Sequence, residues 1–419
     1  MIDLNDLGIK AKRAAAALSE TPESVIDGAL KKAAEMLKEN REELKSANAK
    51  DILNAKEKGL SAAFIDRLTL SSGVINSIAE GLEQIATLSS PVGETIYEYE
   101  NKEQGIKITK KKVPFGVVGM IFESRPNVAA DAFGLSLKTK NAVILKGGSD
   151  AINSNAAIVK VLRAALKTSG IDENAVSLIE DTSRETAAAF MRLNKYVDLL
   201  IPRGGAGLIK AAVENSTIPI IETGTGNCHV YVDEFANPEM AANVIFNAKT
   251  QRYSVCNACE SLVIHEKIAD KALPLIYDRL AEKNVEMRCD EKSLRILSGK
   301  KNVVPATEED FYTEYGDAII SVKVVYSLDG AIAHINEHST RHSEAIITEN
   351  LDNAEKFLNA VDSACVYHNA STRFSDGFIF GLGAEIGIST QKLHARGPMG
   401  LDALTTTKYT VAGNGAVRK

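Results

Sequence analysis

Short apolar runs that alternate with segments of helical spacing constrain the fold of this chain more than any other feature. Each run has the length of a buried strand, and each intervening segment has the length of a helix. Strands and helices that alternate in this way build a parallel sheet covered on both faces, so we predict a doubly wound α/β domain. The runs are 115–122, 142–146, 197–201, 218–221 and 229–232, and the helices between them are predicted at about 126–139, 151–168, 182–193 and 206–214.

The regions on either side of this alternation predict further elements. Residues 3–88 repeat apolar positions every three or four residues, which indicates a helical lead-in. Segments 95–100 and 105–111 alternate in polarity around a short turn and predict a hairpin. A chain of 419 residues exceeds the usual size of one core, so we expect two domains that change near 222–236. Beyond that point we predict a helix at about 237–251, strands at 261–265, 318–326 and 363–368, and a strand-like run at 405–411.

Composition and charge exclude several classes of protein. A net charge of -6 provides no overall basic field for nucleic acid. No apolar run approaches the length of a transmembrane helix, and the N-terminus lacks the basic and apolar regions of a secretory signal. Five scattered cysteines suit free thiols in a reducing compartment. We therefore expect a cytoplasmic protein that binds neither nucleic acid nor a membrane.

Cys256 lies in a polar segment and is a candidate nucleophile. Lys249 and Arg252 precede it, and cations of this kind favour the reactive thiolate. The alternative is a buried structural thiol, because free cysteines are among the most buried residues. Cys256 and Cys259 form a C-x-x-C, but no second pair of ligands lies at zinc spacing, so we predict no metal site there.

Three glycine-rich turns follow predicted strands, at 146–149, 203–207 and 222–227. Backbone N–H groups at such turns bind anions, and open α/β sheets bind ligands at the carboxyl ends of their strands. We interpret the three turns as a nucleotide site. The alternative is that glycine supplies only the positive φ of tight turns. None of them matches G-x-G-x-x-G, so the predicted cofactor contacts are atypical.

Two segments with arginine are further candidate sites for anions. Residues 124–127 open a predicted helix, and both Arg125 and the helix N-terminus favour a phosphate or carboxylate there. A plain helix start is the alternative. Arg396 lies in a second basic, glycine-rich stretch at 394–400.

A row of histidines, His334, His338 and His342, recurs at every fourth residue. That spacing would align three imidazoles on one face of a helix. Residues 339–341 favour a break in the helix, so we predict that the row binds no metal.

Five longer motifs show that the chain resembles members of the aldehyde dehydrogenase superfamily. The resemblance runs nearly end to end and is strongest to the branch that reduces L-glutamyl 5-phosphate. It implies a Rossmann-like cofactor domain, an α/β catalytic domain and a small β oligomerisation element. The motifs are 113–127, 201–205, 250–258, 331–346 and 394–401. The implied divisions are 1–94 and 113–224 for the cofactor domain with its helical lead-in, 225–385 for the catalytic domain, 95–112 and 403–412 for the oligomerisation hairpin and C-terminal strand, and 386–402 for a basic return segment.

The resemblance also implies roles for single residues. Cys256 takes the position of the catalytic cysteine, Lys146 that of the lysine at the adenosine ribose, and Glu314 that of the glutamate at the nicotinamide ribose. Gly204 and its neighbour Gly205 form the turn near the cofactor pyrophosphate.

Glu222, which we group with the cofactor site, lies 34 residues before Cys256, a spacing like that of the superfamily's general base. A reductase that excludes water needs no such base, so a structural role is the alternative.

The remaining contacts stay open between candidates. Ungapped alignment puts Glu123 at the position of the superfamily's oxyanion asparagine, which leaves Asn127 and the Cys256 backbone N–H as candidate donors. The candidate partners of the phosphate and of the α-carboxylate are Arg125, Arg252 and Arg396.

These assignments imply NADPH-dependent reduction of L-glutamyl 5-phosphate to the 5-semialdehyde through a Cys256 thioester, the second step of proline biosynthesis from glutamate. The implied partners are a second copy of the chain, in a homo-oligomer, and transiently glutamate 5-kinase. Two other functions are considered: an oxidising aldehyde dehydrogenase that needs no phosphate, and a nucleotide-binding protein without catalysis.

Overall fold

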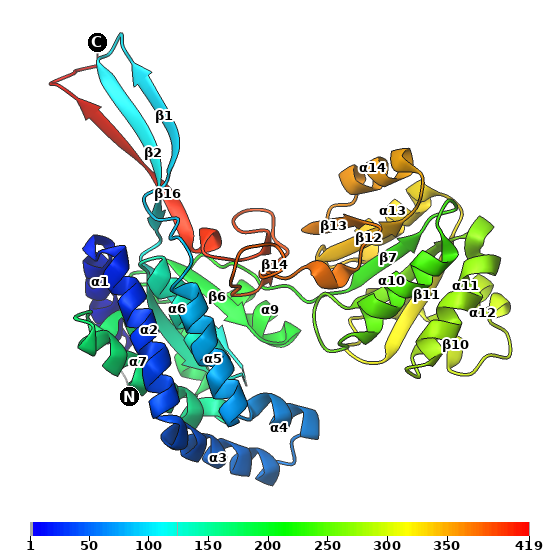
Figure 1. Ribbon diagram of the computed structural model, residues 1–419, viewed down its shortest axis with the longest axis horizontal. Coiled ribbons are helices and arrows are strands. Elements are labelled where there is room, and N and C mark those ends of the chain that lie inside the picture. Colours follow the sequence, from blue (N-terminus) through cyan, green and yellow to red (C-terminus); the bar gives the residue numbers. More distant parts are fainter. Residues whose placement is uncertain (1–2, 124, 419) are drawn as a thin grey trace. The chain divides into compact units, whose positions relative to one another are not determined.

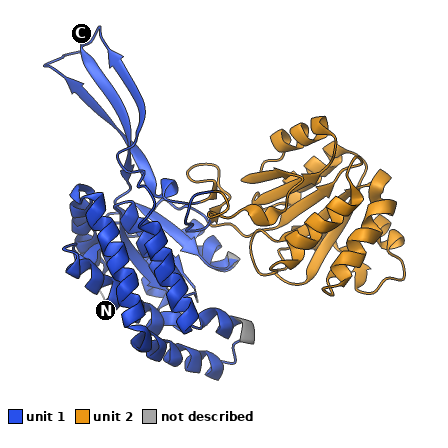
Figure 2. Ribbon diagram, in the orientation of Figure 1, with its two compact units in different colours: residues 1–222, 381–387, 399–419 blue, residues 223–380, 388–398 orange. Residues whose placement is uncertain are grey.

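The computed structural model describes residues 3–123 and 125–418, and the chain divides into two compact units (Figures 1 and 2). The first unit contains residues 1–222, 381–387 and 399–419, and the second contains 223–380 and 388–398. The predicted change of domain near 222–236 thus begins where the first and longest stretch of the first unit ends, at residue 222. Among the described residues, no helix has both the length and the apolar character needed to cross a membrane.

A four-stranded parallel sheet forms the centre of the first unit, in the order β5-β4-β3-β6 (Figure 1). Helices cover both of its faces, as predicted: α1, α8 and α9 pack on one face, and α6 and α7 lie on the other. The strands are β3 (Val117–Phe122), β4 (Ala142–Gly147), β5 (Val176–Leu178) and β6 (Leu199–Arg203). The helices are α6 (Asn127–Lys138), α7 (Ile152–Thr168), α8 (Arg184–Phe190) and α9 (Ala206–Asn215).

The strand predicted at 218–221 is wrong. Only an isolated bridge joins Ile220 to Leu200, and the segment forms no strand of its own. Pro219 lies in the middle of this run and has no N–H to donate to a ladder. The sequence analysis also missed β5, which has only three residues.

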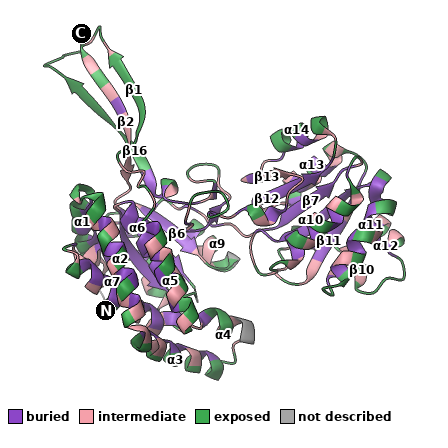
Figure 3. Ribbon diagram, viewed as in Figure 1, coloured by how far each residue is buried: buried purple, intermediate pink, exposed green. Residues whose placement is uncertain are grey.

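The helical lead-in predicted at 3–88 is confirmed as five helices. The side chains of the residues just before two of these helices, Asp3 before α1 and Ser71 before α5, accept hydrogen bonds from backbone N–H groups of the first turn. The apolar stripe of α2 is buried and packs against α5 and α7 (Figure 3). The five helices are α1 (Leu4–Glu20), α2 (Glu23–Glu39), α3 (Arg41–Glu57), α4 (Ala62–Leu68) and α5 (Ser72–Ile85).

An arm of three antiparallel strands extends the first unit. The predicted hairpin is β1 (Thr95–Asn101) and β2 (Ile106–Pro114), and the predicted C-terminal run is β16 (Thr405–Gly413). β16 pairs with β2 from Thr405 opposite Pro114 to Gly413 opposite Ile106. Both β1 and β16 are exposed along almost their whole length (Figure 3).

The second unit is built around a seven-stranded parallel sheet in the order β10-β9-β11-β8-β7-β12-β13 (Figure 1). Side chains alternate between its faces. On β7, Val230 and Val232 pack in the cluster of α10 and α11, whereas Tyr231 between them packs against α13 and α14. The sheet strands are β7 (Cys228–Val232), β8 (Cys259–His265), β9 (Glu286–Cys289), β10 (Val303–Pro305), β11 (Ile319–Val325), β12 (Ser343–Ile347) and β13 (Cys365–His368). The helices are α10 (Pro238–Thr250), α11 (Glu266–Ala281), α12 (Glu291–Ile296), α13 (Leu328–His338) and α14 (Leu351–Ala360), and a short antiparallel pair is β14 (Ile388–Ser389) and β15 (Gly397–Pro398).

Candidate functional site

Cys256 lies in the second unit, in the loop that joins α10 to β8. Its side chain is half-buried, whereas the other four cysteines are buried. Burial raises the pKa of Cys259 and of Cys289 to about 12, and raises the pKa of Cys228 well above its usual range. Those three thiols therefore stay protonated near neutral pH, and Cys256 is the thiol that solvent and a substrate can reach.

The turn at 222–227 packs directly on the backbone of Cys256. A Cβ on Gly226 would lie 1.4 Å from the carbonyl oxygen of Cys256 and 2.6 Å from its Cα, so only glycine fits there. The thiol of Cys228 donates a hydrogen bond to the same carbonyl oxygen, at 3.1 Å. The Gly226 N–H donates to the Glu314 carboxylate, and the pKa of that carboxyl is raised, chiefly by desolvation. This turn therefore fixes the position of the nucleophile loop.

The glycines of the three turns do not serve as positive-φ residues. None of Gly147, Gly204, Gly205, Gly224 and Gly226 has a φ in the left-handed region. A Cβ on Gly147, Gly204 or Gly224 would instead lie within 2.4 to 2.6 Å of a neighbouring side chain. Close approach of the backbone, and not an unusual φ, explains glycine at these positions.

Asn257 ties the loop of Cys256 to a second segment, the single-turn helix Thr372–Phe374. Its side-chain amide donates to the carbonyl of Ser375 at 2.9 Å and to that of Arg373 at 3.4 Å. The hydroxyl of Thr372 donates to the Asn257 carbonyl at 2.8 Å. These bonds hold Arg373 next to the nucleophile loop, where its Nε donates to the side-chain oxygen of Gln251 at 2.9 Å.

Arg373 interacts electrostatically with Cys256 and with Arg252. Burial lowers the pKa of the Arg373 guanidinium, attraction to Cys256 raises it, and repulsion from Arg252 lowers it. Arg252 itself is exposed. Arg373 was not predicted from the sequence. The one signal that could have identified it is an arginine just after the carboxyl end of a parallel strand, where ligands of such sheets bind.

Lys249 does not have the role expected from its place in the sequence. Its ammonium forms a fully buried ion pair with Glu260, with Nζ and Oε2 2.5 Å apart. The other oxygen of Glu260 accepts from the Gly316 N–H at 3.3 Å. A cation that is already paired contributes little to the stabilisation of a nearby thiolate, so Arg252 and Arg373 are the cations available to Cys256.

The histidine row is broken, as predicted. His334 and His338 stack on α13 with ring centroids 4.0 Å apart, but the helix ends at His338. His342 follows a residue with positive φ, Arg341. Within residues 3–123 and 125–418, no group of three or more metal-ligating side chains is arranged to hold an ion.

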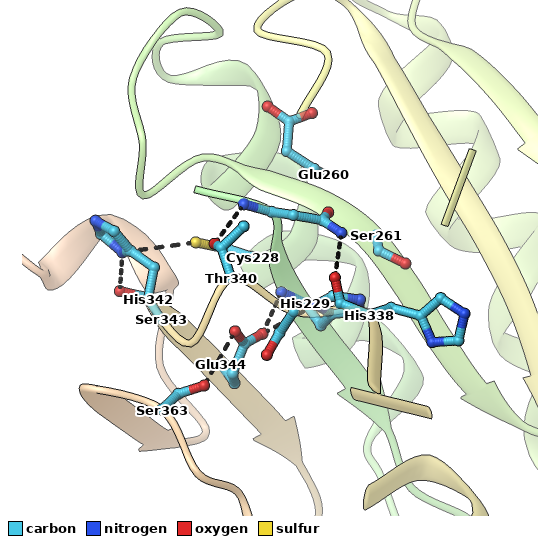
Figure 4. A network of polar contacts seen from close by, with 12 residues as sticks. Cys228, His229, Glu260, Ser261, His338, Thr340, His342, Ser343, Glu344 and Ser363 are labelled. Carbon is cyan, nitrogen blue, oxygen red and sulfur yellow. Dashed lines mark hydrogen bonds and ion pairs between the residues drawn. The ribbon is translucent and has the colours of Figure 1, made fainter. Parts of the chain in front are cut away.

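His342 belongs instead to a buried polar network beside Cys228 (Figure 4). Its Nδ1 lies 3.7 Å from the Cys228 sulfur and 2.8 Å from the Ser343 hydroxyl. One residue farther along each strand, at His229 on β7 and Glu344 on β12, a carboxyl oxygen of Glu344 accepts a hydrogen bond from the backbone N–H of His229 at 2.5 Å (Figure 4). Burial raises the pKa of Glu344 well above its usual range and lowers the pKa of His229 to about 3, so burial disfavours the charged form of each side chain. These contacts between His229 and Glu344 join β7 to β12.

In the first unit, Lys146, Gly204 and Gly205 lie at the carboxyl edge of the sheet. Lys146 is buried, and burial lowers its pKa while attraction to Asp181 raises it. The Gly205 N–H donates to a carboxylate oxygen of Glu123 at 3.0 Å, at the N-terminus of α9. A carboxylate oxygen of the protein thus lies on this helix start, and a helix N-terminus is the kind of position at which anions bind. The residues present therefore fit a nicotinamide dinucleotide.

Arg125 lies between β3 and α6, and Asn127 begins α6. The side-chain amide of Asn127 donates to the Asp131 carboxylate at 3.0 Å. Arg125 is exposed, and its backbone N–H donates to the Glu123 carbonyl at 2.7 Å. Ser124, which belongs to the predicted helix-start motif, lies outside the described residues.

Asp131 gives the start of α6 a pH-dependent stability. Burial raises the pKa of Asp131 from 3.8 to about 6, against smaller opposing effects of Asn127 and Arg203. Because the folded pKa exceeds the unfolded one, the stabilising contribution is complete below about pH 4 and is lost as the pH rises through about 6. We expect Asp131→Asn to raise the midpoint of thermal unfolding by about 2–4 °C at pH 8, and this gain should shrink steadily towards pH 4. A gain of equal size at both pH values would contradict the assignment.

The two remaining site residues predicted from the sequence are Glu222, in the first unit, and Arg396, in the second. Glu222 is half-buried and is the last residue before the second unit begins. Arg396 donates to the carbonyl and to the carboxylate of Asp362, at 3.0 and 2.9 Å. In the second unit, the structure thus places Cys256 and Arg252 in one loop, and Glu314 contacts Gly226, which packs on that loop. In the first unit, Lys146, Gly204 and Gly205 lie at the same edge of the sheet.

Comparison with known proteins gives a consistent result. The model of the aldehyde dehydrogenase family matches residues 3–294. The chain is 55% identical over 419 residues to the gamma-glutamyl phosphate reductase of Lachnospira eligens, covering 100% of both chains. Its structure is similar to the crystal structure of gamma-glutamyl phosphate reductase from Thermotoga maritima, with a TM-score of 0.97, 47% identity and 100% of both chains covered. An acetylating aldehyde dehydrogenase from Geobacillus thermoglucosidasius shares the fold, with a TM-score of 0.70, 18% identity, and 99% of this chain and 97% of that one covered.

Proposed function

Because this chain belongs to the gamma-glutamyl phosphate reductases of the aldehyde dehydrogenase family, we propose that it reduces L-glutamyl 5-phosphate to L-glutamate 5-semialdehyde with NADPH. In this role it is an oxidoreductase of proline biosynthesis and carries out the second step from glutamate. The observation that carries the proposal is the half-buried Cys256, which lies near two arginines in a loop that Gly226 and Asn257 hold in place.

The proposed reaction begins with the Cys256 thiolate. The sulfur attacks the γ-carbonyl carbon, a C–S bond forms, and the bond from that carbon to the phosphate oxygen breaks, so that phosphate leaves with the electron pair. Nearby guanidinium groups favour the thiolate and bind the leaving phosphate. The Cys256 backbone N–H and the Asn127 side chain are the candidate donors to the oxyanion. When bound, the reduced nicotinamide supplies the hydride that converts the thioester into the aldehyde and frees the thiolate.

The proposal assigns each cofactor contact to a named residue. Lys146 would contact the adenosine ribose, the turn of Gly204 and Gly205 the pyrophosphate, and Glu314 the nicotinamide ribose. Glu222 would line the cofactor site without acting as a base, because the reaction uses no water. The place of Lys146 near the carboxyl end of β4 and that of Gly205 at the N-terminus of α9 support these assignments. Arg125, Arg252 and Arg396 are kept as candidate partners of the phosphate and the α-carboxylate.

We also propose that the chain forms a homo-oligomer through its arm. Large apolar side chains are exposed on β1 and β16, and soluble proteins rarely leave such groups in contact with water. These side chains are Ile96, Tyr97, Tyr99, Tyr409 and Val411. An acyl phosphate is short-lived in water, so we further propose a cytoplasmic location and transient contact with glutamate 5-kinase, which makes the substrate.

The test is the phosphate dependence of the reverse reaction. With the semialdehyde and NADP⁺, NADPH should form only when inorganic phosphate is present, and NADP⁺ should be preferred to NAD⁺. Oxidation that proceeds without phosphate would instead identify an oxidising aldehyde dehydrogenase. Binding of NADPH with no turnover in either direction, including with acyl phosphate made in place by the kinase, would identify a protein that only binds nucleotide.

A further inference from the structure

Arg373 carries a charge that no acidic side chain neutralises. The second unit has seven arginines, and among the described residues five of them form ion pairs with aspartate or glutamate, whereas Arg252 and Arg373 do not. The five that are paired are Arg279, Arg288, Arg295, Arg341 and Arg396. The carboxylate of Asp376 attracts Arg373, but the two side chains form no ion pair. The two unpaired guanidinium groups repel each other, and both belong to the surroundings of Cys256.

Two unpaired cations beside a nucleophile favour a ligand with more than one negative charge. In an acyl phosphate, the phosphoryl group is attached through one oxygen to the carbon that the thiolate attacks. It therefore stays close to Cys256 during the reaction, whereas the α-carboxylate lies several bonds farther along the substrate. The local charge matches the phosphoryl group.

The hydrogen bonds that Arg373 makes within the protein leave its two terminal guanidinium nitrogens available to bind a ligand. Its Nε is taken by Gln251, and its own backbone N–H and carbonyl are bound by Ser371 and Asn257. The two terminal nitrogens of the guanidinium remain to form a fork, the geometry in which arginine binds two oxygens of one phosphate. The hydrogen bonds from Asn257 to the carbonyls of Arg373 and Ser375 position this fork relative to the nucleophile loop.

We propose that Arg373 is a substrate-binding residue that holds the phosphoryl group of the acyl phosphate beside Cys256, with Arg252 as the second cation of the same subsite. This inference rests on the proposed function. In the reverse direction the subsite binds inorganic phosphate, whose oxygen attacks the thioester carbon while the C–S bond breaks and the thiolate leaves.

The test compares Michaelis constants in the reverse direction for wild type, Arg373→Gln and Arg373→Lys. Loss of a charge-assisted fork should raise the KM for inorganic phosphate by about 10–100-fold in Arg373→Gln. Arg373→Lys keeps the charge but not the fork and should fall between Arg373→Gln and wild type. The KM for the semialdehyde should change less than twofold. Arg295→Gln, which removes an exposed arginine of α12, is the matched control and should leave both constants unchanged.

A second measurement requires no turnover. Inorganic phosphate should slow the alkylation of Cys256 by iodoacetamide in wild type. In Arg373→Gln, the phosphate concentration that gives the same protection should be at least about 10-fold higher. A rise in the KM for the semialdehyde alone would place Arg373 at the α-carboxylate and overturn the proposal. Unchanged phosphate constants in both variants would overturn it as well. If wild type itself oxidises the semialdehyde without phosphate, the proposed function fails, which is a distinct result.

Discussion

Cys256→Ala is expected to lower kcat/KM for the reduction of L-glutamyl 5-phosphate by at least about 10⁴-fold. The proposed reaction has no route around the thioester, because without the sulfur neither the phosphate can be displaced nor the acyl group held for reduction. The side chain is half-buried and small, so its removal should leave the fold intact. Initial rates of NADPH oxidation, with the acyl phosphate made in place by its kinase, measure the effect.

Cys289→Ala is the matched control for this change. Cys289 is a buried thiol of β9, two strands away from β8 in the sheet. Its removal should cost some stability but leave the reaction rate within about threefold of wild type, since a buried cysteine behaves as a small apolar side chain. Equal activity of Cys256→Ala and Cys289→Ala would contradict the covalent mechanism.

Gly226→Ala is expected to lower kcat/KM by at least about 100-fold, although Gly226 touches no reacting atom. The added Cβ would overlap the carbonyl group of Cys256, at 1.4 Å from its oxygen and 2.3 Å from its carbon. A backbone group cannot turn aside as a flexible side chain can, so the nucleophile loop must move. A shift of about 1 Å is enough for a loss of this size.

Gly28→Ala provides the comparison for a glycine in open surroundings. Gly28 lies within α2, and nothing lies within 4 Å of a Cβ built there. Alanine is the better helix former, so this change should raise the stability by up to about 1 kcal/mol and leave kcat/KM unchanged. If Gly226→Ala also kept its kcat/KM, the loop would tolerate displacement and the argument from close packing would fail.

Most of the fold could be predicted from the sequence, because the length of an apolar run and the spacing of its apolar residues identify buried strands directly. The runs that became β3, β4, β6 and β7 have this pattern and lie within two or three residues of the observed strands. The failures have local causes: Pro219 interrupts an apolar run, and three-residue strands such as β5 and β10 carry too little pattern to be detected.

The candidate site was less accessible to sequence reasoning, because its shape depends on contacts between distant segments. Lys249 appeared to be a partner of Cys256 until its neighbour across the turn, Glu260, was placed. Arg373 lies 117 residues after Cys256, and only the hydrogen bonds of Asn257 bring the two segments together. No pattern in the sequence predicts that Gly226 lies against the Cys256 carbonyl.

The pairing of β16 with β2 has a consequence for how the chain folds during synthesis. The strand Thr405–Gly413 leaves the ribosome after all other strands, yet its partner Ile106–Pro114 is made before most of the chain. The second unit contains the uninterrupted stretch 223–380, so nearly all of it is available before the first unit receives residues 399–419. One edge of β2 therefore stays without its strand partner through most of translation, and the unit that begins the chain is the last to be completed.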